Sequence, residues 1–382
     1  MRRTLPHGKW RKRLKIKALP PFAELHKVRA GNCKMFILNI ERITQEGLDN
    51  SSAKLFPADT VLVAMYGATI GACSILGFEA STNQACAAFL PTSKVLPDYL
   101  YYFLQSKKDI FVQSSVGGAQ PNISAGYLKR FPFDIIPVES QRKIISALDS
   151  VSTLISLRKQ QLAKLDELVK VRFVEMFGDP ISNPMGWNIS TLKNVTKKIG
   201  SGATPKGGKE SYHTEGISLI KSMNVYDGRF EYKDLAHIDT YQAEQLSNVE
   251  VYKNDVFINI TGASVARSCI VPDHVLPARV NQHVSIIRCN QSVFEPIFAN
   301  QQFLNPSFKK MLLGLGEAGG ATRQAITKQQ LEDLDVIVPP MNFQKDFFVF
   351  VAHIGRQKLT IQQSLDKLEV LKKLLMQEYF TL

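Results

Sequence analysis

Apolar residues recur at alternating steps of four and three along two long stretches of the chain. In residues 138–177 this stripe starts at Ile144, in residues 341–380 it starts at Phe347, and eight of its ten positions are apolar in each stretch. The first stretch contains neither proline nor glycine, and the second contains only Gly355. This heptad spacing predicts one long amphipathic helix in each stretch.

Each predicted helix needs a partner for its apolar stripe. At 1.5 Å per residue, a helix of about 38 residues is about 57 Å long. We predict that the two helices form an antiparallel coiled coil with Ser140 and Asn342 as N-caps; the alternative is that each helix packs on its own domain. The predicted helix–helix seam consists of Leu148, Val151, Ile155, Leu162 and Leu165 with Val351, Ile354, Ile361, Leu365 and Leu368.

The rest of the sequence has the pattern of strands and turns. Short apolar runs end in glycine or asparagine, as in TVLVAMYG at residues 60–67 and VFINITG at 256–262. Such runs predict strands bounded by turns. We therefore expect an α/β (α+β) fold, with two globular strand-rich domains at 1–137 and 181–340. Two long helical segments, at 138–180 and 341–382, would separate them.

The chain repeats itself at a distance of about 200 residues. QLAKLDELVKVRFVEMF at 161–177 shares seven of seventeen positions with SLDKLEVLKKLLMQEYF at 364–380. The same shift pairs Gln141 with Gln344 and Pro137 with Pro340, and GGAQPNIS at 117–124 parallels GGATRQAIT at 319–327. One duplicated unit per half predicts an internal pseudo-two-fold axis, as in an isologous dimer.

Net charge favours an acidic partner only weakly. The total is +13, but residues 1–34 hold eleven Lys and Arg against one acid, so one tail carries most of the excess. Such a tail binds nucleic acid or is simply a solvated terminus. The five scattered cysteines favour a reducing, cytoplasmic location, and no apolar run is long enough to span a membrane.

We find no motif for catalysis. An adenine methyltransferase would need Asn or Asp before Pro-Pro-aromatic, and neither Pro20-Pro21 nor Pro339-Pro340 has it. Residues 200–211 resemble a phosphate-binding loop, but Glu210 stands where Ser or Thr is required. The seven histidines have no metal-ligand spacing. The sequence predicts no catalytic and no metal site.

The ordered motifs, seen twice, resemble the specificity (S) subunit of type I restriction–modification systems. They are the P-x-x-x-Q starts of the long helices (Pro137 and Pro340), their L-x-K-L segments, MFGDP at 176–180, and the two Asn-Gln stretches. The segment from Trp187 through SGATPKGG at 201–208 adds to them. The resemblance covers nearly the whole chain from about Ile37.

The resemblance implies a non-catalytic DNA-reading subunit. Each strand-rich domain would be a target-recognition domain for one half of a bipartite, asymmetric DNA sequence. The helices would space the domains and dock two methyltransferase subunits, which use S-adenosylmethionine; two restriction subunits, which use ATP and Mg, would join them. The alternatives are an enzyme, a related restriction system with a fused methyltransferase–nuclease partner, and a coiled-coil scaffold that binds no DNA.

Candidate DNA contacts follow from side-chain chemistry. Glycine-rich loops with hydroxyls and cations suit phosphates, and Asn, Gln and Arg can address base edges. The alternative is that they are ordinary turns and strand caps. The candidates are Ser201, Thr204, Lys206, Lys209, Tyr212, Arg267, Asn281, Gln282, Thr322, Arg323 and Gln324 in the second half, with Tyr66, Asn83, Gln84, Gln120 and Asn122 in the first.

The two halves differ at their starts. Trp10 to Pro137 spans 127 residues and Trp187 to Pro340 spans 153, so the first domain is 26 residues shorter. It also has no counterpart of SGATPKGG. Either this domain is abbreviated or its natural start is replaced by unrelated sequence. In the first case Trp10 is the repeat counterpart of Trp187, and in the second it is not.

Overall fold

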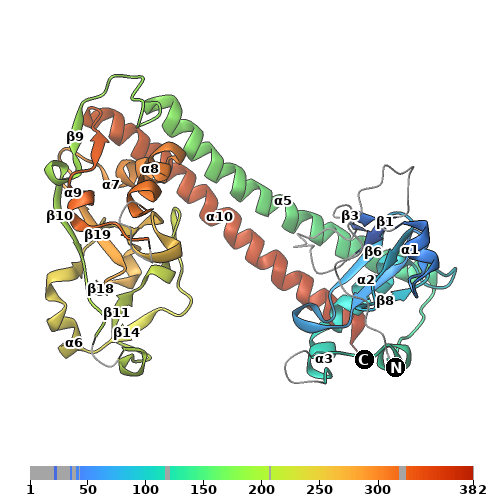
Figure 1. Cartoon of the computed structure of the whole chain (residues 1–382). Coiled ribbons are helices and arrows are strands. Elements are labelled where there is room, and N and C mark those ends of the chain that lie inside the picture. Colours follow the sequence, from blue (N-terminus) through green and yellow to red (C-terminus); the bar gives the residue numbers. More distant parts are fainter. Residues whose placement is uncertain are drawn as a thin grey trace. The chain divides into compact units, whose positions relative to one another are not determined.

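The computed structural model describes residues 44–116, 121–205, 208–317 and 324–381, with the backbone of the strands at 21–23, 35–36 and 40–42. The chain divides into two compact units (Figure 1). Unit 1 is Met1–Gln161 with Ile361–Leu382, and unit 2 is Leu162–Thr360. The fold is mixed helix and strand, as the sequence predicts.

Unit 2 contains two four-stranded sheets. The first is antiparallel, in the order β10 (Thr196–Ser201), β19 (Val284–Cys289), β16 (Val256–Asn259) and β17 (Ser268–Ile270). The second has the order β14 (Ala236–Ile238), β11 (Ile217–Ile220), β18 (Ala278–Val280) and β15 (Glu250–Val251). Two pairs complete the strands: β12 (Val225–Tyr226) with β13 (Arg229–Phe230), and β9 (Ile189–Thr191) with β20 (Asp335–Ile337). The short helices are α6 (Thr240–Gln245), α7 (Pro296–Leu304), α8 (Pro306–Glu317) and α9 (Lys328–Glu332).

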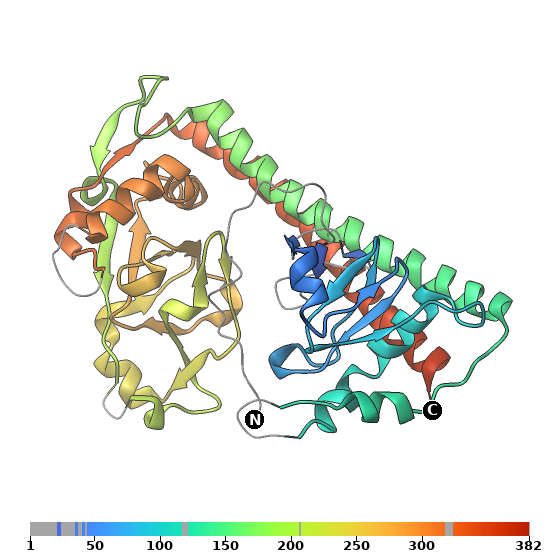
Figure 2. The same cartoon turned by 45° about the vertical axis from the view of Figure 1, so that its right-hand side comes forward.

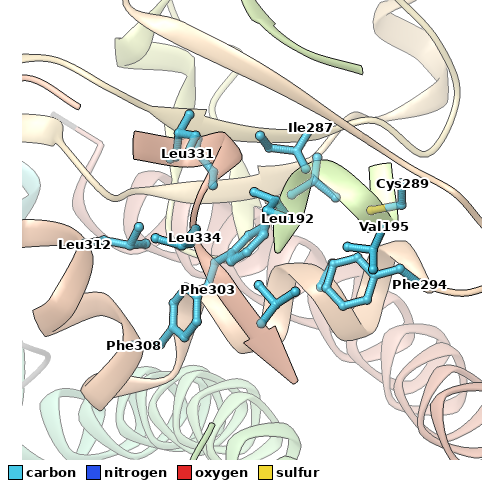
Figure 3. Close-up of a cluster of buried hydrophobic side chains, with 14 of the residues drawn as sticks. Leu192, Val195, Ile287, Cys289, Phe294, Phe303, Phe308, Leu312, Leu331 and Leu334 are labelled. Atoms are coloured by element: carbon cyan, nitrogen blue, oxygen red, sulfur yellow. The ribbon is translucent and has the colours of Figure 1, made fainter. Parts of the chain in front are cut away.

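An apolar core holds the first sheet of unit 2 against helices α7 and α8. Leu192 and Val195, which precede β10, lie in this core beside Phe294 and Phe303 (Figure 3). All four side chains are at most 3% exposed. At about 25 cal/mol per Å² of buried apolar surface, each such side chain contributes roughly 1.5–3 kcal/mol to folding.

Unit 1 repeats this arrangement in the part that the structure describes. One sheet has the order β2 (Met35–Phe36), β6 (Cys73–Leu76), β5 (Val61–Ala64) and β8 (Cys86–Phe89). The other has the order β3 (Ile40–Arg42), β1 (Pro21–Ala23), β7 (Ala80–Thr82) and β4 (Leu55–Phe56). The short helices are α1 (Gln45–Asp49), α2 (Pro97–Ser106), α3 (Lys108–Gln113) and α4 (Ala125–Arg130), and α2 packs on β5 and β6 (Figure 2).

The repeat extends to backbone conformation. Asp59 and Asn254, just before β5 and β16, have φ values of 66° and 68°. Gly67 and Gly262, in the turns after these strands, have φ values of 64° and 71°. Positive φ is uncommon for residues other than glycine, so the same turns are built twice.

The long helices are α5 (Val138–Phe177) and α10 (Met341–Phe380), each 40 residues long. They run antiparallel within each unit. In unit 1, Lys159 forms an ion pair with Glu369 at 2.7 Å. In unit 2, Asp166 pairs with Lys358, and further along α5 the rings of Phe173 and Phe347 are 5.6 Å apart.

The residues of the predicted seam are shielded from solvent, while their pairing across the two helices stays a prediction. None of its ten predicted members is exposed, and Leu148, Ile155, Ile354 and Leu365 are at most 5% exposed. The predicted N-caps are wrong, because Ser140 and Asn342 lie inside the first turn of α5 and α10.

The helix starts are fixed by two buried glutamines instead. Gln141 and Gln344 are 0% exposed. The Gln344 amide donates to Val293 O and Pro339 O, and its Oε1 accepts the Glu295 N–H at 2.9 Å. Gln141 makes the equivalent contacts with Lys94 O, Ile136 O and the Leu96 N–H. Gln141 therefore connects α5 to the loop before α2, and Gln344 connects α10 to the loop before α7.

Candidate nucleic-acid interface

Turns that follow or precede three strands of unit 2 meet at one edge. Gly202, after β10, donates its N–H to Asn281 O at 3.1 Å, and Thr204 Oγ1 donates to Gln282 Oε1. Thr261, after β16, places its Oγ1 2.5 Å from His283 Nδ1. We call Thr204, Thr261, Gln282, His283 and Gln324 the polar edge. Gln324 joins it because its carbonyl accepts the Gly262 N–H at 2.9 Å.

Glycine is required where the loop after β10 passes the neighbouring strand. A Cβ at Gly202 would lie 1.8 Å from Val280 O. The glycine of the SGATP motif therefore serves close backbone approach. It leaves the exposed Thr204 beside the exposed Gln282.

Asn281 is placed as a turn residue. It is 6% exposed, and its Oδ1 accepts the His283 N–H at 3.0 Å. Asn83 in unit 1 accepts the Ala85 N–H in the same way at 3.0 Å. This geometry agrees with the strand-capping alternative for both asparagines, whereas the glutamines that follow them are exposed.

A basic hollow of about 660 Å³ adjoins the polar edge through Ser201. Its lysines are Lys193, Lys197, Lys198 and Lys328. Lys198 Nζ donates to Asn248 O, and burial, together with the Arg288 guanidinium, lowers the pKa of Lys198. Lys193, Lys197 and Lys328 are exposed, although Lys328 also pairs with Glu332 at 3.4 Å. The hollow suits phosphate oxygens.

Arg267 is held on an aromatic ring. Its guanidinium lies 4.5 Å from the centroid of the Tyr226 ring, and Arg229 lies 4.6 Å from the same ring. Lys221 Nζ is 5.4 Å from the ring of Tyr212, and burial raises the pKa of Tyr212. Cation–π contacts of this kind fix the direction of a charged side chain. Sequence reasoning missed Tyr226 and Arg229, although YDGR at 226–229 combines an aromatic residue, a turn and a cation.

Unit 1 builds an equivalent edge from different side chains. Tyr66 is 44% exposed and bridges to Asn122, as Thr261 bridges to Ala325 in unit 2. The Met65 N–H donates to Ala85 O at 2.8 Å, which brings the turn that contains Gln84 to the same place. The structure thus brings Tyr66, Gln84 and Asn122 together.

Four predicted contacts lie outside the described residues: Lys206, Gln120, Thr322 and Arg323. The backbone of Lys209 is described, but its side chain is not. Their roles stay predictions.

The described residues contain no group of three or more His, Cys, Asp or Glu arranged to hold a metal ion. Among the described helices, none has both the length and the apolar character of a membrane span.

Known proteins share parts of this sequence. Residues 24–167 match the family model described as type I restriction modification DNA specificity domain. The chain is 24% identical over 131 residues to the EcoR124I/EcoR124II specificity subunit of Escherichia coli, covering 33% of this chain and 32% of that protein. It is 23% identical over 277 residues to the putative MjaX specificity subunit of Methanocaldococcus jannaschii, covering 66% of this chain and 60% of that protein. The matches thus span about a third and three fifths of these relatives.

Solved structures share the fold. A chain from a study of complex assembly and conformational transition in the type I R-M system has a TM-score of 0.56 at 16% identity, covering 90% of this chain and 86% of that one. The type I S subunit from M. genitalium has a TM-score of 0.52 at 14% identity, covering 94% and 91%.

Each of the two units combines strand-rich sheets with antiparallel segments of the two long helices. Residues 24–167 are similar to the DNA specificity domain of type I restriction–modification systems. The resemblance to their specificity subunits that the sequence motifs suggested is confirmed.

Proposed function

We propose that this chain selects the DNA sequence on which a type I restriction–modification complex acts. The observation that carries the proposal is the convergence of exposed Thr204 and Gln282 beside the basic hollow of unit 2. A glutamine can bind adenine in a bidentate manner, and lysines neutralise phosphates. The polar edge would contact base edges, and the lysines of the basic hollow would bind phosphates of the DNA backbone.

The two units would read the two halves of a bipartite, asymmetric target. Their frames agree, but Tyr66 stands where unit 2 has Thr261, and Ala72 stands where it has Arg267. Different side chains on one frame give different base preferences. Methyl transfer with S-adenosylmethionine, and cleavage with ATP and Mg, would belong to partner subunits.

Replacing Gln282 with Ala should weaken binding to the specific target by about 1–3 kcal/mol, because one bidentate base contact is lost. The measurement is a titration of labelled duplex with the chain assembled with its methyltransferase subunits. The preference for one base pair of the target should relax.

Gln291→Ala is the matched control. Gln291 is an exposed glutamine just beyond the other end of β19. It should bind DNA like the parent protein. Equal affinity and an unchanged methylation pattern for Gln282→Ala would remove Gln282 from the interface. Binding that does not weaken with added salt would reject the DNA role itself and favour a protein-binding scaffold.

We propose further that repeated apolar faces dock two copies of one methyltransferase subunit. Leu168 and Val171 near the end of α5 are 44% and 56% exposed. Their repeat equivalents near the end of α10, Leu371 and Leu374, are 42% and 56% exposed. Exposed apolar residues at equivalent places mark two equal binding surfaces.

Changing Val171 to Asp should abolish one of the two docked partners and leave the other, since a buried unpaired charge is costly at an interface. Light scattering should show a complex lighter by one methyltransferase subunit. Lys170→Asp, at the neighbouring exposed position, is the control. A parent complex with only one partner per chain would contradict the two-site proposal.

A further inference from the structure

Four side chains of the polar edge form one continuous hydrogen-bonded chain. Thr204 Oγ1 donates to Gln282 Oε1, and Gln282 Nε2 lies 3.2 Å from His283 Nε2. On the other side of the imidazole ring, His283 Nδ1 lies 2.5 Å from Thr261 Oγ1. The hydrogen bonds therefore connect the loop after β10, the turn before β19 and the turn after β16.

The direction of these hydrogen bonds follows from the chemistry of the two middle side chains. An amide nitrogen donates and cannot accept, so His283 Nε2 accepts from Gln282 Nε2. In a neutral imidazole the other ring nitrogen then carries the proton, so Nδ1 donates to Thr261 Oγ1. The hydroxyls at the two ends can each donate or accept. The tautomer of the histidine therefore decides which side of the Gln282 carboxamide holds the oxygen.

These contacts use half of the hydrogen-bonding capacity of the Gln282 carboxamide. Its oxygen has two lone pairs, and its nitrogen has two hydrogens. Among the described residues, Thr204 takes one lone pair and His283 takes one hydrogen, which leaves one acceptor and one donor for a ligand. A glutamine uses one acceptor and one donor to bind N6 and N7 of adenine. The exposed side chain of Gln282 therefore keeps the groups that a bidentate base contact needs.

The turn before β19 does not need the histidine side chain. In unit 1, the equivalent turn is Asn83-Gln84-Ala85, and the Ala85 N–H donates to Asn83 Oδ1 at 3.0 Å. In unit 2, the His283 N–H donates to Asn281 Oδ1 at 3.0 Å. Alanine therefore supports this turn as well as histidine does. The partly buried imidazole of His283 must serve something other than the backbone.

We propose that His283 is a positioning residue for base recognition, and that it orients the Gln282 carboxamide towards the base pair. The inference rests on the proposed DNA role of the polar edge. An amide that is already held on two sides loses little side-chain freedom on binding. Its orientation also matters, because N7 and N6 of adenine lie in opposite order across A·T and T·A base pairs. A held amide therefore distinguishes the two orientations of the pair, and a rotating amide does not.

The test measures how strongly each variant prefers the target over a duplex with one reversed base pair. The target comes from sequencing of methylated sites, and the reversed pair is the one at which Gln282→Ala relaxes the preference. Each variant is titrated as a complex with its methyltransferase subunits. His283→Ala should lower the preference at this base pair about tenfold and leave the other positions unchanged. His283→Gln should keep most of the preference, because the new amide oxygen can accept the Gln282 N–H.

His353→Ala is the matched control. His353 is exposed on α10, and its Nε2 lies 3.0 Å from Gln357 Nε2, so the variant removes a histidine–glutamine contact outside the polar edge. It should bind DNA with the preference of the parent protein. Adding His283→Ala to Gln282→Ala should cause no further loss of preference, because the two side chains act as a unit.

Several results would overturn the inference. A His283→Ala variant with the preference of the parent would show that the imidazole does not orient the amide. Equal weakening at every position of the target, or additive losses in the double variant, would assign His283 a purely structural role. A His283→Gln variant no better than His283→Ala would show that the residue does not act as a hydrogen-bond acceptor. If Gln282→Ala itself relaxes no base pair, the DNA role of the polar edge fails, and this inference fails with it.

Discussion

Deleting one heptad from each long helix should shorten the spacer between the two half-sites of the DNA target by about 3 bp. The deletions are residues 159–165 of α5 and residues 363–369 of α10. Each helix becomes about 10 Å shorter at 1.5 Å per residue, and ten base pairs span roughly 34 Å. Sequencing of methylated sites in cells that carry the complex gives the spacer directly.

These segments are chosen because they face each other. Lys159 and Glu369 form an ion pair, so the two deletions remove both partners together, and they leave the proposed docking residues in place. The seam repeats every seven residues, and a heptad deletion therefore joins equivalent seam positions. The polar edge and the basic hollow contain no deleted residue, so the half-site sequences should stay the same.

A five-residue deletion is the control. Removing 159–163 and 365–369 shortens the helices by a similar length but rotates the seam out of register, so assembly should fail. If the heptad variant assembles and methylates with an unchanged spacer, the helices do not set the distance between half-sites.

Replacing Gln344 with Leu should lower the free energy of unfolding of unit 2 by about 3 kcal/mol or more. The change leaves the Glu295 N–H and the carbonyls of Val293 and Pro339 without the partners that they have in the parent protein. Each buried polar group left unsatisfied costs about 1–3 kcal/mol. Chemical denaturation, monitored by hydrogen exchange of the α7 and α10 amides, measures the loss of unfolding free energy.

The equivalent change in unit 1, Gln141→Leu, should have a similar effect there. Gln357→Leu is the control, because Gln357 is an exposed glutamine on the same helix as Gln344; it should change the stability by no more than about 0.5 kcal/mol. A Gln344→Leu variant as stable as the control would mean that the buried amide does not fasten the helix.

The seam was predictable because helix periodicity is a local property of the sequence. Apolar steps of three and four put Leu148 and Ile155 on one face whatever the rest of the chain does. The helix starts were not predictable in this way. Ser140 has the side chain of an N-cap, but it lies inside the helix. The buried Gln141 beside it donates to the Lys94 carbonyl, 47 residues away in sequence.

The candidate interface was likewise predictable only in part. Sequence chemistry singled out the pair Asn281-Gln282, but it could not say which of the two side chains is available. In the fold, Asn281 accepts a turn hydrogen bond and is buried, whereas Gln282 is exposed and its amide bonds to Thr204, 78 residues away in sequence, and to His283. Thr261 and His283 meet only because β16 and β19 are neighbours.

The sequence by itself determined the repeat, the two helices and the buried apolar stripe along each, because identity and periodicity are local properties of the chain. Only the tertiary structure decided that Gln141 and Gln344 are buried and bonded to the loops before α2 and α7, and that Thr204 and Gln282 share an edge. These properties depend on which distant strands become neighbours, and hydrogen bonds between residues far apart in sequence leave no local pattern.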